Sequence, residues 1–175
     1  YTRQEAREKL GLTDERPLLL SYWGSLGAEV MNRKMSEFIA RECYDGAPFH
    51  HIHGAGRDYG WMQEEIGRRG LALEGTGIEV REYIYDMPLV MAAAVAKPSI
   101  LVPSPNVTAN HQEKNARVLA DQGAAVLLLE RDCVENTLYD AADHLLRDRR
   151  RRDDMVRALT AMAVPDAGEK IYWTL

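Results

Sequence analysis

The sequence predicts an α/β domain built on a Rossmann-like open parallel sheet flanked by helices. Short apolar runs alternate along the chain with longer amphipathic runs, and this alternation is typical of βαβ units. The apolar run 124–129 is uninterrupted, as in a parallel strand that is covered on both faces. In sheets of this kind ligands bind beyond the carboxyl ends of the strands, so a site is expected in the loops that follow strands.

The expected elements fill the chain without an interdomain linker, so residues 1–175 are interpreted as one domain. Strands are expected at 17–22, 49–53, 78–84, 99–102 and 124–129. Helices are expected at 29–41, 59–69, 87–94 and 111–121, with two or three more between 134 and 175. Gly123 is placed to end the helix at 111–121, and Pro165 to break the last region.

Composition narrows the class of protein. Hydrophobic residues make up 46% of the 175, which is enough for a sizeable core. The net charge of -5 argues against a protein that tracks nucleic-acid phosphates, but backbone N–H groups can still hold a nucleotide. Two isolated cysteines, Cys43 and Cys133, favour a reducing cytoplasm. Residues 1–9 do not resemble a signal peptide, and no apolar run approaches the roughly 20 residues of a membrane span.

The loop Gly24-Ser25-Leu26-Gly27 joins the first expected strand to the first expected helix. Its glycines allow a sharp turn and a close approach to a ligand, and the start of the following helix favours a phosphate. Ser25 adds a hydroxyl donor. The loop is neither a dinucleotide fingerprint nor a Walker A motif, so on its own it fits a tight strand-to-helix turn equally well.

Hydrogen-bonding side chains gather in the segment 103–115, after the fourth expected strand. Asn110 and Glu113 fit an N-cap and a third helical position, which is an ordinary structural arrangement. Capping does not account for Gln112 or Asn115, and this density of polar groups at a helix start suits sugar hydroxyls and amides. The pattern therefore favours a ligand site over a purely structural turn.

Three further patterns are interpreted as structural. Asp86 precedes an expected helix, where it fits a cap. His51 and His53 would face one side of a strand, but with His50 they offer no third ligand at a useful spacing, so a metal is not expected. The four arginines at 149–152 precede two aspartates, which is typical of a solvated helix face, with contact to anionic lipid as the alternative.

The order of the motifs resembles one family. Gly-Ser-Leu-Gly-Ala at 24–28 is followed by Tyr-Ile-Tyr-Asp-Met at 83–87 and by Lys-Pro-Ser-Ile-Leu-Val-Pro at 97–103. His-Gln-Glu-Lys-Asn-Ala follows at 111–116, and Gly-Ala-Ala at 123–125. This series is similar to the C-terminal domain of the MurG family of glycosyltransferases, which place N-acetylglucosamine on the lipid-linked muramoyl-pentapeptide precursor of peptidoglycan.

The resemblance implies that this chain is one of the two Rossmann-like halves of a GT-B glycosyltransferase. The C-terminal half of such enzymes binds the sugar donor, here UDP-N-acetylglucosamine. The Ser25 loop would approach the diphosphate of this donor, together with its neighbours Gly24, Leu26 and Gly27.

The remaining donor contacts implied by the resemblance lie in the two later motifs. Ile84 and Met87 would line the uracil pocket. His111 and Gln112 would contact the donor sugar or the diphosphate, and Asn115 would support that turn.

The resemblance also places the lipid acceptor, the membrane-facing surface and the catalytic base in an N-terminal half that this chain lacks. The catalytic residues are therefore unknown here, and the chain alone is expected to be inactive. The full-length enzyme would be cytoplasmic and peripheral on the inner face of the cell membrane. Enzymes of this type resemble metal-independent catalysts, so neither a metal nor a cofactor is expected. A nucleic-acid partner is not expected either.

One stretch departs from the family pattern. The family has a further strand, a glycine-containing turn and a helix whose glutamate binds the ribose, whereas here Ala94 leads almost directly to Lys97. Either the chain carries a real deletion, or its numbering runs across residues that are left out. We expect the second, because deleting about fifteen to twenty residues would remove a strand from the middle of a parallel sheet. The Cα spacing between Ala93 and Lys97 would distinguish the two.

Two alternatives remain open at the level of sequence. The chain fits the donor domain of another GT-B enzyme that acts on a different acceptor, such as a glycolipid or a macrolide, although the motif at 111–116 favours the peptidoglycan enzyme. It also fits a non-catalytic nucleotide-binding module. An N-terminal partner domain in the same gene would separate the enzyme from the module.

Overall fold

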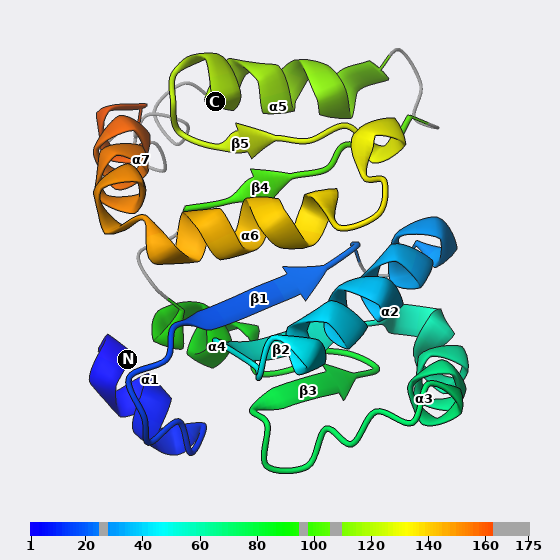
Figure 1. Cartoon of the computed structure of the whole chain (residues 1–175). Helices are drawn as coiled ribbons and strands as arrows, with labels where there is room; N and C mark the ends of the chain where they lie inside the picture. The colour runs from blue at the N-terminus through cyan, green and yellow to red at the C-terminus, as the bar shows by residue number, and fades with distance from the viewer. Residues whose placement is uncertain (25–27, 95–97, 106–109, 163–175) are drawn as a thin grey trace, which may run out of the picture.

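A computed structural model of the chain describes residues 1–24, 28–94, 98–105 and 110–162. The strands are β1 (Leu18–Tyr22), β2 (His50–Gly54), β3 (Ile78–Arg81), β4 (Ile100–Leu101) and β5 (Val126–Leu127). The α-helices are α1 (Arg3–Lys9), α2 (Glu29–Tyr44), α3 (Tyr59–Arg68), α4 (Met87–Ala93), α5 (His111–Asp121), α6 (Thr137–Arg147) and α7 (Arg149–Met162). Short 3-10 helices lie at Gly56–Asp58 and Glu130–Asp132. This alternation confirms the predicted α/β class (Figure 1).

The strands form two parallel sheets instead of the single sheet that the sequence predicted. One sheet has the order β1-β2-β3, and the other pairs β4 with β5. The strand arrows of both sheets point the same way, so the carboxyl ends of β1 and β4 lie on one side of the molecule (Figure 1). Among the described residues β1 pairs only with β2, and β4 only with β5. The open sheet is therefore divided between β1 and β4.

The strands at this division are less well covered than the centre of the larger sheet. Every residue of β2 is buried, as expected for a central parallel strand. In β1, by contrast, Leu19 and Leu20 are only partly buried. Both residues of β4 and both of β5 are partly buried too, although all four are apolar. The apolar edges on either side of the division thus retain contact with solvent.

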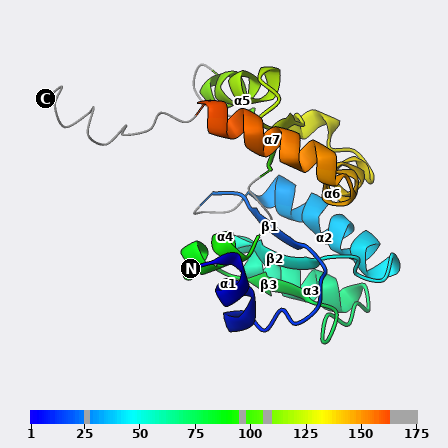
Figure 2. The same ribbon diagram turned by 90° about the vertical axis from the view of Figure 1, so that its left-hand side faces the viewer.

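Two groups of helices cover the faces of the larger sheet. Its main core joins residues of α2, α3 and α6 to the sheet, and the fully buried side chains there include Met35, Ile39, Phe49 and Met62. A smaller cluster on the other face packs α1 and α4 against β1 and β2. In Figure 2 the larger sheet and α1–α4 form the lower part of the molecule, and α5–α7 lie above them.

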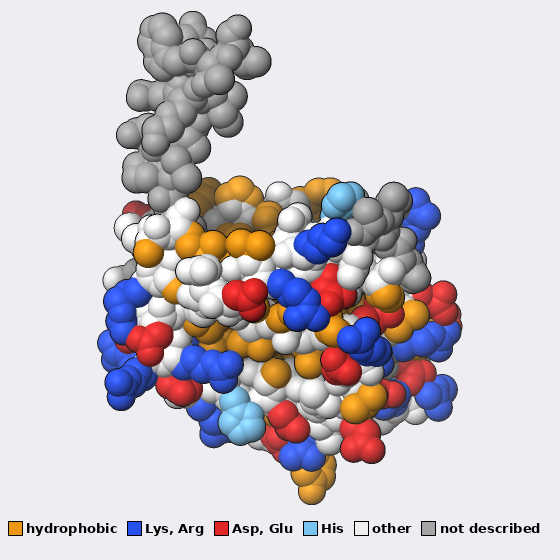
Figure 3. Space-filling model, turned by 90° about the horizontal axis from the view of Figure 1, so that it is seen from above, with side chains coloured by type: hydrophobic (Ala, Val, Ile, Leu, Met, Phe, Trp, Pro, Cys, Tyr) orange, Lys and Arg blue, Asp and Glu red, His pale blue; other side chains and the backbone are white. Residues whose placement is uncertain are grey.

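The upper part is covered more thinly. Helix α5 packs against β5, and α6 contacts both α2 and α7. On α5 the buried residue is Ala116, whereas Val118 is 59% exposed. Seen from above, this face shows hydrophobic side chains among charged ones (Figure 3). Most of the core therefore belongs to the β1-β2-β3 half.

The arginine run 149–152 forms the first residues of α7, so it lies in a helix as predicted. Arg149, Arg150 and Arg151 are exposed, and Arg149 pairs with Asp153. Arg152 is partly buried and donates to carbonyl groups at the end of α6. The run therefore acts as a helix face that also caps α6, and the predicted break near Pro165 lies outside the described residues.

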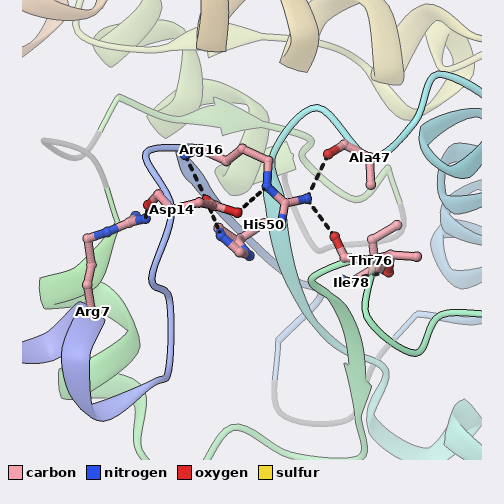
Figure 4. Close-up of polar contacts among 7 residues, drawn as sticks. All are labelled: Arg7, Asp14, Arg16, Ala47, His50, Thr76 and Ile78. Atoms are coloured by element: carbon pink, nitrogen blue, oxygen red, sulfur yellow. Dashed lines mark hydrogen bonds and ion pairs between the residues drawn. The ribbon is translucent and has the colours of Figure 1, made fainter.

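A polar clip ties the segment before β1 to the starts of β2 and β3 (Figure 4). Arg16 donates to Asp14 at 2.8 Å, to the Ala47 carbonyl at 2.9 Å and to the Thr76 carbonyl at 2.6 Å. His50 lies 2.7 Å from the Asp14 carboxylate. The clip holds the amino ends of all three strands together, on the side opposite the expected site.

This clip gives a pH prediction. Although burial acts against the shift, hydrogen bonds from Arg16 lower the pKa of Asp14 from 3.8 to about 2. A carboxyl whose pKa is lower in the folded protein stabilises it above the unfolded pKa and stops doing so as pH falls through the folded one. Asp14→Asn is therefore expected to remove part of the fall in the free energy of unfolding between about pH 4 and 2, by no more than about 1 kcal/mol because the site is exposed.

Urea titrations at several pH values measure this effect. Glu15→Gln is the matched control, because Glu15 is an exposed neighbour of Asp14. An unchanged acid slope in the Asp14 variant would show that the clip does not stabilise the fold.

Candidate functional site

The backbone after β1 has a conformation that would let a ligand come close to it. Gly24 has φ +70, a left-handed conformation that favours glycine. Ala28, the N-cap of α2, makes no side-chain hydrogen bond, so no side chain at that position occupies the first N–H groups of the helix. These groups suit an anion, as the sequence predicted. Ser25, Leu26 and Gly27 lie outside the described residues, so their contact with a diphosphate stays a prediction.

The second predicted motif reaches the same end of the larger sheet. Strand β3 ends at Arg81, earlier than expected, so Ile84 lies in the turn before α4. A Cβ built on Gly54 would lie 3.2 Å from Ile84 Cδ1 and 3.5 Å from Tyr22 Cβ. The partly buried Ile84 therefore covers the carboxyl ends of β1 and β2. Met87 follows as the first residue of α4 and is also partly buried.

Asp86 has the N-cap position of α4 that the sequence predicted, but it does not cap in the usual way. Its side chain makes no cap hydrogen bond. The carboxylate instead accepts from Arg81 at 2.9 Å. This ion pair fixes the turn that carries Ile84, which agrees with a structural role.

The third motif begins α5, at the end of the smaller sheet. His111, Gln112 and Asn115 are all exposed there. The Gln112 side-chain oxygen accepts from the Ser104 N–H at 2.9 Å, so Gln112 also holds the loop that follows β4. Residues 106–109 lie outside the described part of the chain.

Asn110 shows that the predicted capping arrangement was wrong in detail. It has the N-cap position of α5, but with φ 53 it is left-handed and makes no cap hydrogen bond. Its amide donates to Glu113 at 2.8 Å, and that carboxylate also pairs with Arg117. A side-chain pair replaces the capping box, because a left-handed backbone does not direct the Asn110 side chain toward the first helical N–H groups.

The predicted site residues thus fall into two groups. Gly24, Ile84 and Met87 belong to the β1-β2-β3 half, whereas His111, Gln112 and Asn115 belong to the β4-β5 half. Figure 1 shows the ends of β1 and β4 and the start of α5 on one side of the molecule. A ligand bound between the two halves would touch both groups.

The structure also reveals a buried polar network that the sequence analysis missed. The Ser21 hydroxyl lies 2.7 Å from His51 Nε2 and 2.8 Å from His53 Nδ1. His51 Nδ1 lies 2.8 Å from Glu42 Oε2, and both of these side chains are fully buried. His53 Nε2 lies 3.1 Å from Asn32 Oδ1. His51 and His53 do share a face of β2, as predicted, but they serve hydrogen bonds below the end of β1.

Burial governs the charge of this network. Burial first, and His51 second, lower the pKa of His53 to about 3, against a smaller opposing effect of the Ser21 backbone. His53 is therefore neutral near pH 7. In the described part of the chain no three His, Cys, Asp or Glu side chains gather in a way that would hold a metal ion.

Comparisons with known proteins connect these features to one family. Residues 92–171 match the model of the glycosyltransferase family 28 C-terminal domain. Two curated relatives are named UDP-N-acetylglucosamine–N-acetylmuramyl-(pentapeptide) pyrophosphoryl-undecaprenol N-acetylglucosamine transferase. The one from Acetivibrio thermocellus is 36% identical over 98% of this chain, and the one from Caldanaerobacter subterraneus subsp. tengcongensis is 33% identical over 97%. The chain spans 50% of the length of each.

One of these alignments is longer than the part of this chain that it covers. The alignment with the Acetivibrio thermocellus relative extends over 189 residues, although 98% of this 175-residue chain is about 172. About 17 positions of the relative therefore have no counterpart in this chain.

The fold has a solved neighbour as well. The crystal structure of Acinetobacter baumannii MurG is similar with a TM-score of 0.72 at 23% identity, over 98% of this chain and 52% of that one. The family model, the relatives and the fold agree. The chain carries a glycosyltransferase family 28 C-terminal domain at residues 92–171, and over nearly its whole length it is similar to half of the transferases named above.

Proposed function

We propose that this chain binds UDP-N-acetylglucosamine as the donor half of the transferase that places N-acetylglucosamine on lipid-linked muramoyl-pentapeptide. The observation that supports this most is the 36% identity, over 98% of the chain, to a relative with that printed activity. The geometry is compatible with it. Gly24, the start of α2 and the turn with Ile84 meet at the carboxyl end of the larger sheet, where α/β domains bind nucleotides.

The proposed chemistry divides the work between two halves. A base removes the proton of the acceptor hydroxyl, which displaces UDP from the anomeric carbon with inversion. Helix N–H groups at the start of α2 would stabilise the negative charge on the departing diphosphate. The base and the acceptor site belong to the half that the chain does not span, so we expect donor binding without turnover. Transfer by this chain alone to a lipid acceptor would contradict that division.

The lipid-linked acceptor implies that the full-length enzyme works at a membrane. The described residues include no helix that is long and apolar enough to cross a bilayer. We propose a peripheral position on the inner face of the cell membrane for the full-length enzyme, with contact made by the other half, because the acceptor in the relatives' printed name is lipid-linked.

We also propose that a strand-and-helix unit is missing between Ala94 and Lys97. Two observations support this position: the sheet is divided between β1 and β4, and apolar strands on both sides are partly exposed. A third supports the size of the unit, because about 17 positions of the relative have no counterpart in this chain. Doubly wound sheets often have the order 3-2-1-4-5-6, in which the fourth strand lies beside the first. Residues 95–97 lie outside the described part, so the Cα spacing there is untested.

The donor assignment predicts a differential effect at Gln112. Gln112→Ala is expected to weaken the binding of UDP-N-acetylglucosamine more than the binding of UDP. The difference in binding free energy should be about 0.5–1.5 kcal/mol, because one hydrogen bond to the sugar is lost. Calorimetry with both ligands measures the difference. The loop contact to Ser104 is lost in both titrations, so it cancels in the comparison. Equal losses for the two ligands would mean that Gln112 supports the loop or the diphosphate instead of the sugar.

A further inference from the structure

The buried network below the end of β1 has a fixed direction of hydrogen bonding. Its starting point is the Asn32 side chain, whose amide nitrogen lies 2.8 Å from the Ala55 carbonyl and 2.8 Å from Asp58 Oδ2. Both partners are acceptors, so the amide nitrogen must donate to them. The Asn32 oxygen therefore faces His53 Nε2, and it can only accept.

The proton positions follow step by step from Asn32. His53 Nε2 must carry a proton to donate to the Asn32 oxygen. Neutral His53 then has a bare Nδ1, which accepts from the Ser21 hydroxyl. A hydroxyl has one proton, so Ser21 must accept from its other partner, and His51 Nε2 has to donate. With His53 neutral, this arrangement is the one that satisfies every hydrogen bond of the network.

The last step concerns the pair at the closed end of the network. With Nε2 protonated, His51 has two possible states beside Glu42. Either His51 is doubly protonated and Glu42 is ionised, or His51 is neutral and accepts from a protonated Glu42. Both states place one proton more on the pair than an ionised carboxylate beside a neutral imidazole would have. The pair then has no net charge, which fits two side chains with no exposed surface.

We propose that the Glu42–His51 pair carries this extra proton at neutral pH and that Ser21, oriented by it, positions the end of β1 for the donor diphosphate. Ser21 lies three residues before Gly24, and the Trp23 ring lies 6.4 Å from that of His53. The role as a positioning device rests on the proposed function, whereas the proton count rests on the hydrogen bonds together with the neutral state of His53.

The aromatic rings and the thiol beside the pair carry no charge. His51 packs against the rings of Phe38 and Phe49. Burial, with Glu42 second, raises the pKa of the Cys43 thiol, and burial, with Asp45 second, raises that of the Tyr139 hydroxyl, so both are neutral.

The charged groups of the neighbouring elements lie outside the pair. Asp58 ends the network beyond Asn32, and Lys34 on α2 donates to the Cys133 carbonyl. His50 belongs to the clip with Asp14. Loss of the extra proton would therefore place an uncompensated negative charge below a bound diphosphate.

The proton count is tested by nuclear magnetic resonance of the histidine ring nitrogens in the whole chain, without ligand. At neutral pH we expect His53 to carry its proton on Nε2, and His51 to be protonated at Nε2. A neutral His51 with its proton on Nδ1 alone would overturn the proposal. Glu42→Gln extends the test, since an amide donor should hold a neutral His51 in the Nε2 form.

The positioning role is tested by the pH dependence of UDP-N-acetylglucosamine affinity. We expect the affinity of the unaltered chain to fall on the order of tenfold once alkaline pH removes the extra proton, and this dependence to vanish in Glu42→Gln. Glu37→Gln, on the exposed face of α2, should keep the original profile.

The possible outcomes are distinguishable. Identical pH profiles for the unaltered chain and Glu42→Gln would overturn the positioning role. Absence of donor binding at every pH would instead refute the proposed function and the positioning role with it, while the ring-nitrogen spectra would still decide the proton count.

Discussion

Inserting the missing positions of the Acetivibrio thermocellus relative after Ala94 is expected to raise the affinity for UDP-N-acetylglucosamine by about tenfold or more. A strand in that place would pair with both β1 and β4 and would bury the apolar side chains that are now partly exposed, among them Leu19, Leu20 and Ile100. It would also fix the Gly24 loop relative to the start of α5. A ligand that touches both halves would then no longer have to order them on binding.

Calorimetry and urea unfolding measure the two consequences, which are tighter donor binding and a larger free energy of unfolding. A Gly-Ser insert of equal length is the control, because it adds chain without a strand. If both inserts behave alike, the division between β1 and β4 is not a vacant strand position.

Gly77→Ala is expected to destabilise the fold by about 2–4 kcal/mol, from overpacking together with backbone strain. Gly77 has φ +88, and a Cβ there would lie 2.4 Å from His50 Nδ1. The neighbouring atoms cannot yield easily, because His50 is held by Asp14 and because Arg16, whose guanidinium would lie 3.2 Å away, is bound to two carbonyl groups. The variant therefore disrupts the clip at the amino ends of the strands.

Gly75→Ala is the matched control in the same turn. Gly75 has φ +75, but a Cβ there would meet nothing within 4 Å. It should cost only the backbone strain, roughly 1–2 kcal/mol. Denaturant unfolding of the two variants separates the cost of overpacking from the cost of backbone strain. Equal losses in the free energy of unfolding would show that the contact with His50 is absent in solution.

Periodicity predicted most of the elements because each depends on residues close in sequence. Helix α5 occupies the predicted 111–121, and α2 and α4 begin where they were expected. Helix α1 was missed although it has a local signal. Thr2 and Glu5 form a capping box, with both reciprocal hydrogen bonds present.

The division of the sheet and the buried network had no comparable signal. Strand pairing is decided by tertiary contacts, so the sequence alone did not show that β1 and β4 remain unpaired. The network joins Ser21, Asn32 and Glu42 to the histidines of β2, and these residues are 9 to 32 positions apart. The sequence placed His51 and His53 on one face of a strand as structural residues, but it did not show their hydrogen-bond partners, because these lie on other elements.

The site residues were found mainly through the resemblance. Local patterns gave Gly24 and Gln112 as candidates, but Ile84 has no polar group and no motif of its own to mark it. Its position over Gly54 is visible only in the fold. Whether any of these side chains touches a donor remains a prediction.

The most direct test of the donor assignment is a calorimetric titration of the chain with UDP-N-acetylglucosamine, UDP and an adenine nucleotide sugar. We predict saturable heat with both uridine ligands and none with the adenine ligand, because the base pocket would be formed by the turn at Ile84. Binding of the adenine ligand without binding of UDP would contradict the assignment of this chain as a UDP-sugar-binding half.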